Sequence, residues 1–140
     1  MPKKNDLFVD TSGWAYYLDR SDPLHTKVVT IVRNYTLQRR NLVTTNYIIT
    51  ELVALLSSRF HLPRREVIKA INALKSDAAV EIVHIDASMD NVAWQLLEKR
   101  FDKEWSLVDA SSFVLMEQFG MTEALTTDHH FTQAGFIKLL

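Results

Sequence analysis

Four acidic side chains stand where this sequence is otherwise apolar or where a helix begins. Glu51 is the only charge in the stretch 41–58, and it lies in an expected helix that is apolar almost all round. Asp10 and Asp128 each follow a short apolar run, and Asp109 opens a helical pattern. A lone buried carboxylate costs several kcal/mol or takes up a proton. We therefore expect a cation, a hydrogen-bond network or a wet cleft beside Glu51; a helix edge that reaches water stays open as the alternative.

The aspartates also have purely structural interpretations. Ser106 and Asp109 have the spacing of a capping box, in which an acid in the first helical turn complements the helix dipole. Asp10 and Asp128 each precede an expected helix start, as an N-cap would. Asp86 does the same, and we interpret it only as a cap. Chemistry is therefore indicated by where the acids meet rather than by any one of them.

The elements that must position these acids alternate between short apolar runs and longer helical patterns. Such alternation is typical of an α/β fold whose parallel sheet is covered by helices on both faces. We predict five strands, at 7–9, 42–44, 81–83, 124–126 and 136–137.

Four helices have recognisable ends. One is expected to open at Asp22 and Pro23 and to run toward residue 40, and another opens near Pro63. A third follows Asp86, and a fourth runs from about 107 to Gly120, where glycine accepts the left-handed conformation beyond a helix end. The polar segment 2–6 is expected to fray.

Ligands of open parallel sheets bind beyond the carboxyl ends of the strands. Asp10 and Asp128 follow strands that the chain order places near one another, and Glu51 and Asp109 are expected in the first turns of helices that start at the same sheet edge. The four acids can therefore converge. Carboxylates crowded into one cleft repel one another unless hard divalent cations neutralise them, which indicates Mg²⁺ or Mn²⁺.

Four segments of the chain resemble the signature blocks of PIN-domain nucleases, and most closely those of the VapC-type toxins of bacterial toxin–antitoxin pairs. The likeness covers nearly the whole chain in the family's order. The segments are 8–12 (FVDTS), 44–47 (TTNY) with Glu51, 106–113 (SLVDASSF), and 126–131 (TTDHHF) with 134–136 (AGF).

This resemblance implies a three-layer α/β/α domain with a five-stranded parallel sheet and an acidic site for Mg²⁺ or Mn²⁺. It implies cleavage of structured RNA, a ribosomal hairpin loop or tRNA, leaving a 5′-phosphate and a 3′-hydroxyl. Homodimers and a small antitoxin partner are also implied. By position, the catalytic and metal-binding residues are the four acids, and the supporting polar residues are Thr11 and Ser106. Many members carry a further acid where this chain has His130, which puts a full second metal site in question.

The remaining polar candidates concern the substrate. Arg59, Arg64 and Arg65 flank an expected turn between two helices, where they could contact an RNA backbone. His129 and His130 are adjacent, so on a helix their rings diverge by about 100° and do not readily share one ion. A substrate-phosphate contact or a helix start is the expected role of His130, ahead of a direct metal role.

Four aromatic residues could stack on bases or could belong to the core or a dimer interface. They are Trp14, Tyr16, Tyr17 and Trp105.

Composition narrows the alternatives. The 140 residues predict one domain over 1–140, with no span or signal segment, so we expect a cytoplasmic protein without a membrane partner. Without cysteine, thiol chemistry and thiolate zinc sites are excluded, and three scattered glycines build no phosphate loop. The net charge is −1, but 16 basic residues face 13 acidic ones once four of the 17 acids are assigned to a site, a balance of +3. Selective, metal-mediated contact with RNA fits this balance better than tight nonspecific binding.

Two other classes of protein fit the chain poorly. A phosphoacceptor receiver domain needs an acid directly after the third strand, where His84 stands, and a haloacid-dehalogenase-type phosphatase needs a second aspartate at the position of Ser12. The stronger alternative is a catalytically inert PIN-like module that binds RNA or protein.

Overall fold

A computed structural model describes residues 1–140 of the chain. Five short strands alternate with seven helices. The strands are β1 (Leu7–Val9), β2 (Leu42–Thr45), β3 (Val80–Val83), β4 (Glu123–Leu125) and β5 (Ile137–Lys138). The helices are α1 (Thr11–Leu18), α2 (His25–Leu37), α3 (Asn46–Ser58), α4 (Arg64–Ser76), α5 (Ala87–Lys99), α6 (Leu107–Gln118) and α7 (His129–Gln133).

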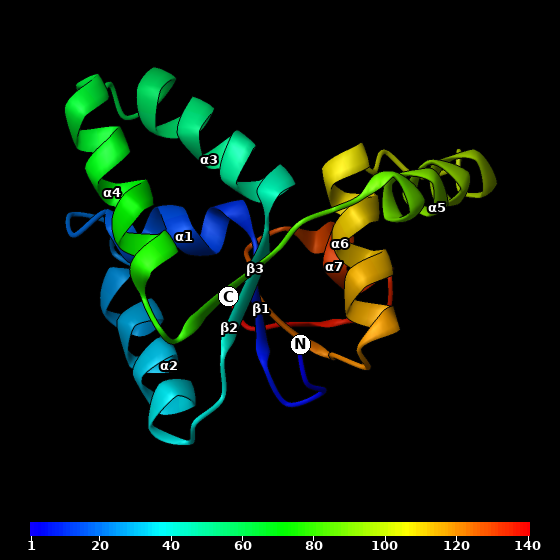
Figure 1. Cartoon of the computed structure of the whole chain (residues 1–140), viewed down its shortest axis with the longest axis horizontal. Coiled ribbons are helices and arrows are strands. Elements are labelled where there is room, and N and C mark those ends of the chain that lie inside the picture. Colours follow the sequence, from blue (N-terminus) through cyan, green and yellow to red (C-terminus); the bar gives the residue numbers. More distant parts are fainter.

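All five strands are parallel and form one sheet in the order β3-β2-β1-β4-β5. Helices α1 to α4 lie on one side of this sheet and α5 to α7 on the other (Figure 1). This arrangement confirms the predicted three-layer α/β/α fold with a five-stranded parallel sheet. Strands β1 and β2 are buried at every residue, as their continuous apolar character predicts for a sheet covered on both faces.

The centre of the sheet is a topological switch point. From β1 the chain steps outward to β2 and β3 on one side, and it then returns to place β4 and β5 on the other side. Phe8 and Val9 of β1 pair with Ala124 and Leu125 of β4. Because successive connections diverge here, the loops beyond β1 and β4 leave a crevice, which is where open α/β sheets bind ligands.

Helix α1 packs unusually close to β4, and a glycine permits this contact. A Cβ atom added to Gly13 would lie 2.3 Å from the carbonyl oxygen of Leu125. The amide of Asp10, just before the helix, donates to the same carbonyl at 3.2 Å. The close approach therefore fixes the start of α1, and Asp10 with it, against the end of β4.

Several predicted boundaries shift by a few residues. The helix expected from Asp22 begins at His25, because the Asp22 carboxylate accepts from the amide of Leu24 and makes a turn of its own. It ends at Leu37, and Arg39 just beyond it has a left-handed φ of 59°. Glu51 lies in the second turn of α3, one turn later than predicted.

The predicted fraying of the polar segment 2–6 is wrong at its end. Asp6 is 3% exposed, and its carboxylate accepts from the amides of Lys3 and Asn41 at 2.8 Å each. These two bonds hold the polar segment against the start of β2. No helix in the chain is both long enough and apolar enough to cross a membrane.

Candidate active site

The four acids line one pocket of about 500 Å³ beyond the carboxyl ends of β1 and β4. They come from four different places: the ends of the two strands and helices α3 and α6. The convergence predicted from the sequence is therefore what the structure shows. The other lining residues are Thr11, Ser12, Ala15, Tyr16, Asp22, Leu55, Arg59, Phe60, Glu104, Ser106, Thr127 and His130.

Asp10 lies deepest, directly after β1, and is only 7% exposed. Its Oδ2 accepts from the hydroxyl of Thr126 at 3.0 Å, and that hydroxyl also accepts from the amide of Asp128 at 3.0 Å. Burial raises the pKa of Asp10 to about 7, against the lowering effect of its hydrogen bonds. Asp10 stands at the N-cap position of α1, but its side chain makes no capping bond. The carboxylate is thus directed into the pocket rather than to the helix.

Two hydroxyl residues that sequence reasoning left without a role join the strand ends. The Ser12 hydroxyl lies 3.2 Å from that of Thr126 and accepts from the amide of Thr127 at 3.1 Å. Both belong to the acid-plus-hydroxyl blocks of the sequence, so their position after a strand was the available signal. Their bonds tie the loops beyond β1 and β4 together.

Glu51 is partly buried on α3. Hydrogen bonding compensates for the burial of its carboxylate, which is one of the possibilities that the sequence left open. Its Oε1 accepts from the Thr11 hydroxyl at 2.6 Å. Burial raises the pKa of Glu51, with the Thr11 bond opposing and the charges of Asp109 and Asp128 adding to the rise. Thr11 therefore holds Glu51 over the start of α1.

Asp109 is both a helix cap and a pocket residue. The Ser106 hydroxyl accepts from the Asp109 amide, and Oδ2 of Asp109 accepts from the Ser106 amide, each at 3.0 Å. The predicted capping box is therefore confirmed. Burial raises the pKa of Asp109. The hydrogen bond from the Ser106 amide lowers this pKa in part, and the charge of Asp128 raises it further. The cap fixes the carboxylate without removing it from the cleft.

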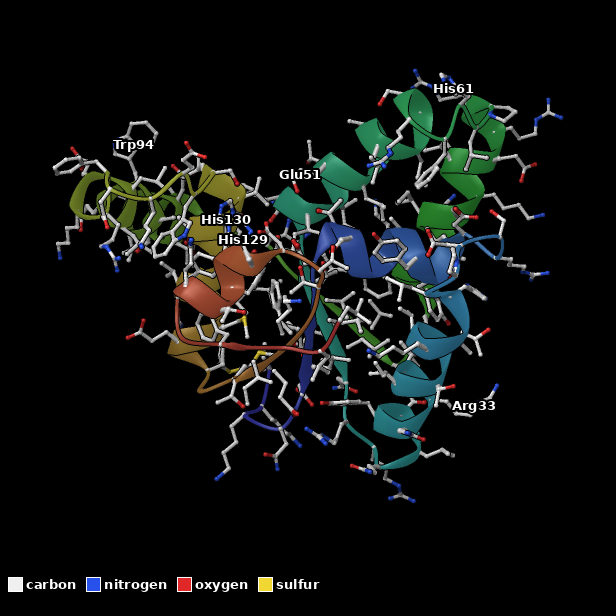
Figure 2. All side chains as sticks on the ribbon, turned by 180° about the vertical axis from the view of Figure 1, so that it is seen from behind. Arg33, Glu51, His61, Trp94, His129 and His130 are labelled. Carbon is white, nitrogen blue, oxygen red and sulfur yellow. The ribbon has the colours of Figure 1, made fainter.

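The two adjacent histidines differ in depth. Nδ1 of His130 lies 3.2 Å from Asp109 Oδ2 and 3.2 Å from Asp128 Oδ1. His129 is far more exposed, and its Nδ1 is 3.8 Å from the same Asp128 oxygen. The rings do not diverge as predicted, since their centroids are 4.4 Å apart and both turn toward Asp128 at the start of the short helix α7. In Figure 2 both histidines lie on the same side of the molecule as Glu51, and of the two only His130 lines the pocket.

No lysine or arginine forms an ion pair with any of the four acids. Buried carboxylates need such a partner, a proton or a metal ion. The ligand atoms of Asp128, His129 and His130 lie within 4.8 Å of one another, a spacing that a single ion can bridge. The donor set of carboxylate oxygens with one buried imidazole nitrogen therefore fits a divalent cation.

The PIN-domain family model matches residues 7–137, which include the sheet and all four acids. The chain belongs to the PIN-domain family. This PIN domain is 31% identical over 133 residues to the 23S rRNA-specific endonuclease VapC20 of Mycobacterium tuberculosis, covering 95% of the chain and 97% of the relative.

Solved structures show the same fold. Crystalline VapC20 of Mycobacterium tuberculosis, described as a sarcin-ricin loop cleaving toxin, superposes with a TM-score of 0.80 at 29% identity, covering 96% of this PIN domain and 98% of VapC20. FitAcB from Neisseria gonorrhoeae gives a TM-score of 0.69 at 17% identity over 96% of each chain. The second likeness concerns the fold alone.

The predicted substrate contacts divide into two groups. Arg59 reaches the pocket from the end of α3, whereas Arg64 and Arg65 lie outside it in the first turn of α4. The α3–α4 turn that carries them projects away from the acids, as the position of His61 in Figure 2 shows.

The aromatic candidates also divide. Trp14 and Trp105 are buried in the hydrophobic core, so their stacking on bases is ruled out in this conformation. Tyr16 lines the pocket, and so does Phe60, which sequence reasoning missed. Asp22 and Glu104 are further missed lining acids, and nothing in their local sequence distinguishes them from ordinary turn residues.

Proposed function

We propose that this PIN domain is a metal-dependent endoribonuclease that hydrolyses phosphodiester bonds of structured RNA and acts as the toxin of a toxin–antitoxin pair. One observation carries the proposal. Four carboxylates, three of them with raised pKa values, converge in one pocket at the switch point of the sheet without a lysine or arginine partner. A core structural role does not need such a cluster, whereas a cation site does.

Each of the four acids has a proposed role in binding the cation. Asp10, Glu51 and Asp109 are the proposed ligands, directly or through water, and Asp128, which completes the pocket, is the fourth. A bound divalent ion supplies an activated water and stabilises the leaving oxygen of the phosphodiester. Thr11 orients Glu51 and Ser106 orients Asp109, as their bonds of 2.6 and 3.0 Å support.

The RNA backbone is proposed to enter past the end of α3. Arg59 lines the acid pocket, so its guanidinium can hold a phosphate beside the one that is cut. Arg64 and Arg65 are exposed at the start of α4 and, together with Arg59, form a basic edge beside the α3–α4 turn. Tyr16 and Phe60 line the pocket next to Arg59 and offer aromatic surface to a base.

A ribosomal RNA hairpin loop is the proposed substrate, with tRNA as the second choice. The likeness to the 23S rRNA-specific endonuclease VapC20 over 97% of that protein's length supports the first. The toxin character of VapC20 supports a small antitoxin partner for this chain as well. A homodimer and action in the cytoplasm complete the proposal.

Mapping of 5′-monophosphate ends tests the substrate. Purified protein with Mn²⁺ is incubated with intact ribosomes and, separately, with total tRNA, and new ends are sequenced. We expect one dominant end in a hairpin loop of the large ribosomal RNA. Dominant cleavage of tRNA contradicts the choice of substrate, and absence of new ends in both samples contradicts the nuclease.

The inert binding module is the alternative function. Calorimetric titration separates the two, because an acid pocket built for catalysis must take up a divalent ion. Heat of Mn²⁺ binding that Asp10→Asn removes supports the nuclease. No heat at millimolar Mn²⁺ supports the inert module.

A further inference from the structure

One buried nitrogen in the acid pocket has no hydrogen-bond partner. Nδ1 of His130 is closed off from solvent, and no group meets it at hydrogen-bonding geometry. Two carboxylate oxygens nevertheless lie close to it, Oδ2 of Asp109 and Oδ1 of Asp128, each at 3.2 Å. Buried polar atoms are nearly always paired, so an unpaired one needs a specific explanation, such as an ion.

Both oxygens beside this nitrogen are held by backbone bonds. Asp109 Oδ2 accepts from the Ser106 amide at 3.0 Å, and Asp128 Oδ1 accepts from the His130 amide at 2.9 Å. Each carboxylate oxygen has two lone pairs, so each keeps one free after its backbone bond. The three atoms are therefore preorganised by the starts of α6 and α7, and none of them is saturated.

The two distances from His130 Nδ1 to the carboxylate oxygens, 3.2 Å each, are those of neighbouring ligands on one ion. Adjacent ligand atoms of an octahedral ion with bonds of about 2.1 Å lie about 3 Å apart. In such a site, the direction from a ligand to its neighbour lies about 45° from its direction to the ion. A nitrogen that faces an ion therefore misses the adjacent oxygens as hydrogen-bond partners, as His130 Nδ1 does.

We propose that His130 Nδ1 is a metal ligand alongside Asp109 and Asp128, and that it shifts the site's preference from Mg²⁺ toward Mn²⁺. The inference rests on the proposed metal-dependent function and names the residue that determines its ion specificity. Transition-metal ions accept imidazole nitrogen, whereas Mg²⁺ prefers oxygen ligands. The proposed role as a metal ligand replaces the phosphate contact expected of His130 from the sequence.

The chain provides a matched control in the neighbouring residue. The His129 side chain is 71% exposed, against 19% for His130, and its Nδ1 lies 3.8 Å from the nearest carboxylate oxygen. The two histidines share a helix and a carboxylate neighbour but differ in depth. His129 Nδ1 belongs to the same group of close ligand atoms as Asp128 and His130, but it does not line the pocket. If the buried nitrogen is the ligand, substitution of His130 should remove the nitrogen ligand and substitution of His129 should not.

The test is electron spin-echo spectroscopy of Mn²⁺ bound to the purified full-length chain, which detects nitrogen nuclei coordinated to the ion. We expect a ¹⁴N signal in the wild type that disappears in His130→Gln and persists in His129→Gln. Calorimetry should show that His130→Gln weakens Mn²⁺ binding by about tenfold and Mg²⁺ binding less, because the amide supplies an oxygen in place of the nitrogen. Labelling the wild type with ¹⁵N-histidine should alter the signal with no substitution at all, so the test does not depend on the folding of a variant.

Three outcomes overturn the inference. If the wild type binds Mn²⁺ but gives no nitrogen signal, His130 is not a ligand and only bridges the two carboxylates. The proposed metal-dependent cleavage is not contradicted by that result. If the ¹⁴N signal is lost in His129→Gln and persists in His130→Gln, the nitrogen ligand is His129 and the proposal for His130 is wrong. No Mn²⁺ binding by the wild type contradicts this inference and the proposed function together.

Discussion

The hydroxyl of Thr126 connects the two strand ends of the acid pocket. It donates to the carboxylate of Asp10 and accepts from the amide of Asp128, so one buried atom positions residues 118 places apart in the chain. Such bonds determine which carboxylate oxygens stay free for a cation. The residues of the candidate site are therefore distinguished from the core by their hydrogen bonds rather than by their burial.

Removing this hydroxyl should weaken the metal site. In Thr126→Val, Asp10 loses a donor and the Asp128 amide loses its acceptor, so we expect Mn²⁺ affinity to fall about tenfold and the free energy of unfolding to fall by about 1–3 kcal/mol. Calorimetry and denaturant titration measure the two effects. Thr44→Val is the matched control, because the buried Thr44 hydroxyl has no partner and its loss should be neutral or stabilising. Equal effects of the two substitutions would contradict the role of Thr126.

The buried carboxyl of Asp10 should make metal-free stability depend on pH. Its folded pKa of about 7 exceeds the value of 3.8 for an unperturbed aspartate, so the folded state binds more protons in this window. Its contribution is therefore present at pH 4 and is lost as pH rises through 7. In EDTA, Asp10→Asn should exceed the wild type in stability by about 2–4 kcal/mol at pH 8 and by much less at pH 4.

Denaturant titration at the two pH values measures this difference. Asp86→Asn is the control, since Asp86 is an exposed cap whose carboxylate accepts from the Met89 amide. It removes no buried carboxylate, so it should not reproduce the gain in stability at pH 8 that we expect of Asp10→Asn. A difference between wild type and Asp10→Asn that does not depend on pH would refute the assigned protonation of Asp10.

At the scale of elements, helix α1 positions two of the pocket's contacts. It begins directly after Asp10, carries Thr11 and crosses β4 where only glycine fits. In Gly13→Ala the new methyl group would meet the Leu125 carbonyl at 2.3 Å, so the helix start must move. We expect a loss of about 1–3 kcal/mol in the free energy of unfolding together with loss of cleavage.

Gly120→Ala provides the contrast for this prediction. Gly120 lies just beyond the end of α6, has a φ of 68° and does not line the pocket. An alanine there strains the backbone by about 1 kcal/mol but moves no acid. Stability should therefore fall while the rate of RNA cleavage by the folded protein stays at the wild-type value. A fully active Gly13→Ala variant would show that α1 does not set the pocket.

The order of the elements and the convergence of the four acids could be predicted from the sequence, because short local patterns indicate where each strand and helix begins. Strand runs, caps such as Asp86 and the Ser106–Asp109 box are short-range patterns, and the structure has each of them. The Ser12–Thr126 contact spans 114 residues, and the turn of both histidines toward Asp128 depends on tertiary packing. Long-range contacts of this kind leave no periodicity in the chain, so no local pattern predicts them.

At the scale of the whole molecule, charge separates the proposed RNA path from the proposed metal site. The net charge of −1 conceals an acid pocket and a basic edge on the α3–α4 turn. Three phosphate contacts by Arg59, Arg64 and Arg65 predict a shallow salt dependence, with a log–log slope of about −2 for single-stranded RNA.

Arg59→Gln should reduce that slope by about 0.7, as expected for one lost phosphate contact. Binding of a catalytically inactive Asp10→Asn background to a hairpin RNA, measured between low and physiological salt, gives the slope. Lys99→Gln at the exposed end of α5 is the control and should leave it unchanged. An unchanged slope in Arg59→Gln would place the RNA backbone elsewhere.

The most direct test of the metal-dependent nuclease is the chemistry of the cut ends. Wild-type protein with Mn²⁺ should leave a 5′-phosphate and a 3′-hydroxyl on a hairpin RNA, as attack by a metal-activated water predicts. EDTA should stop the reaction, and Asp10→Asn, folded and compared at equal concentration, should slow it by at least about a hundredfold. Cleavage that persists in EDTA, leaves a 2′,3′-cyclic phosphate, or proceeds at the wild-type rate in Asp10→Asn would contradict the account.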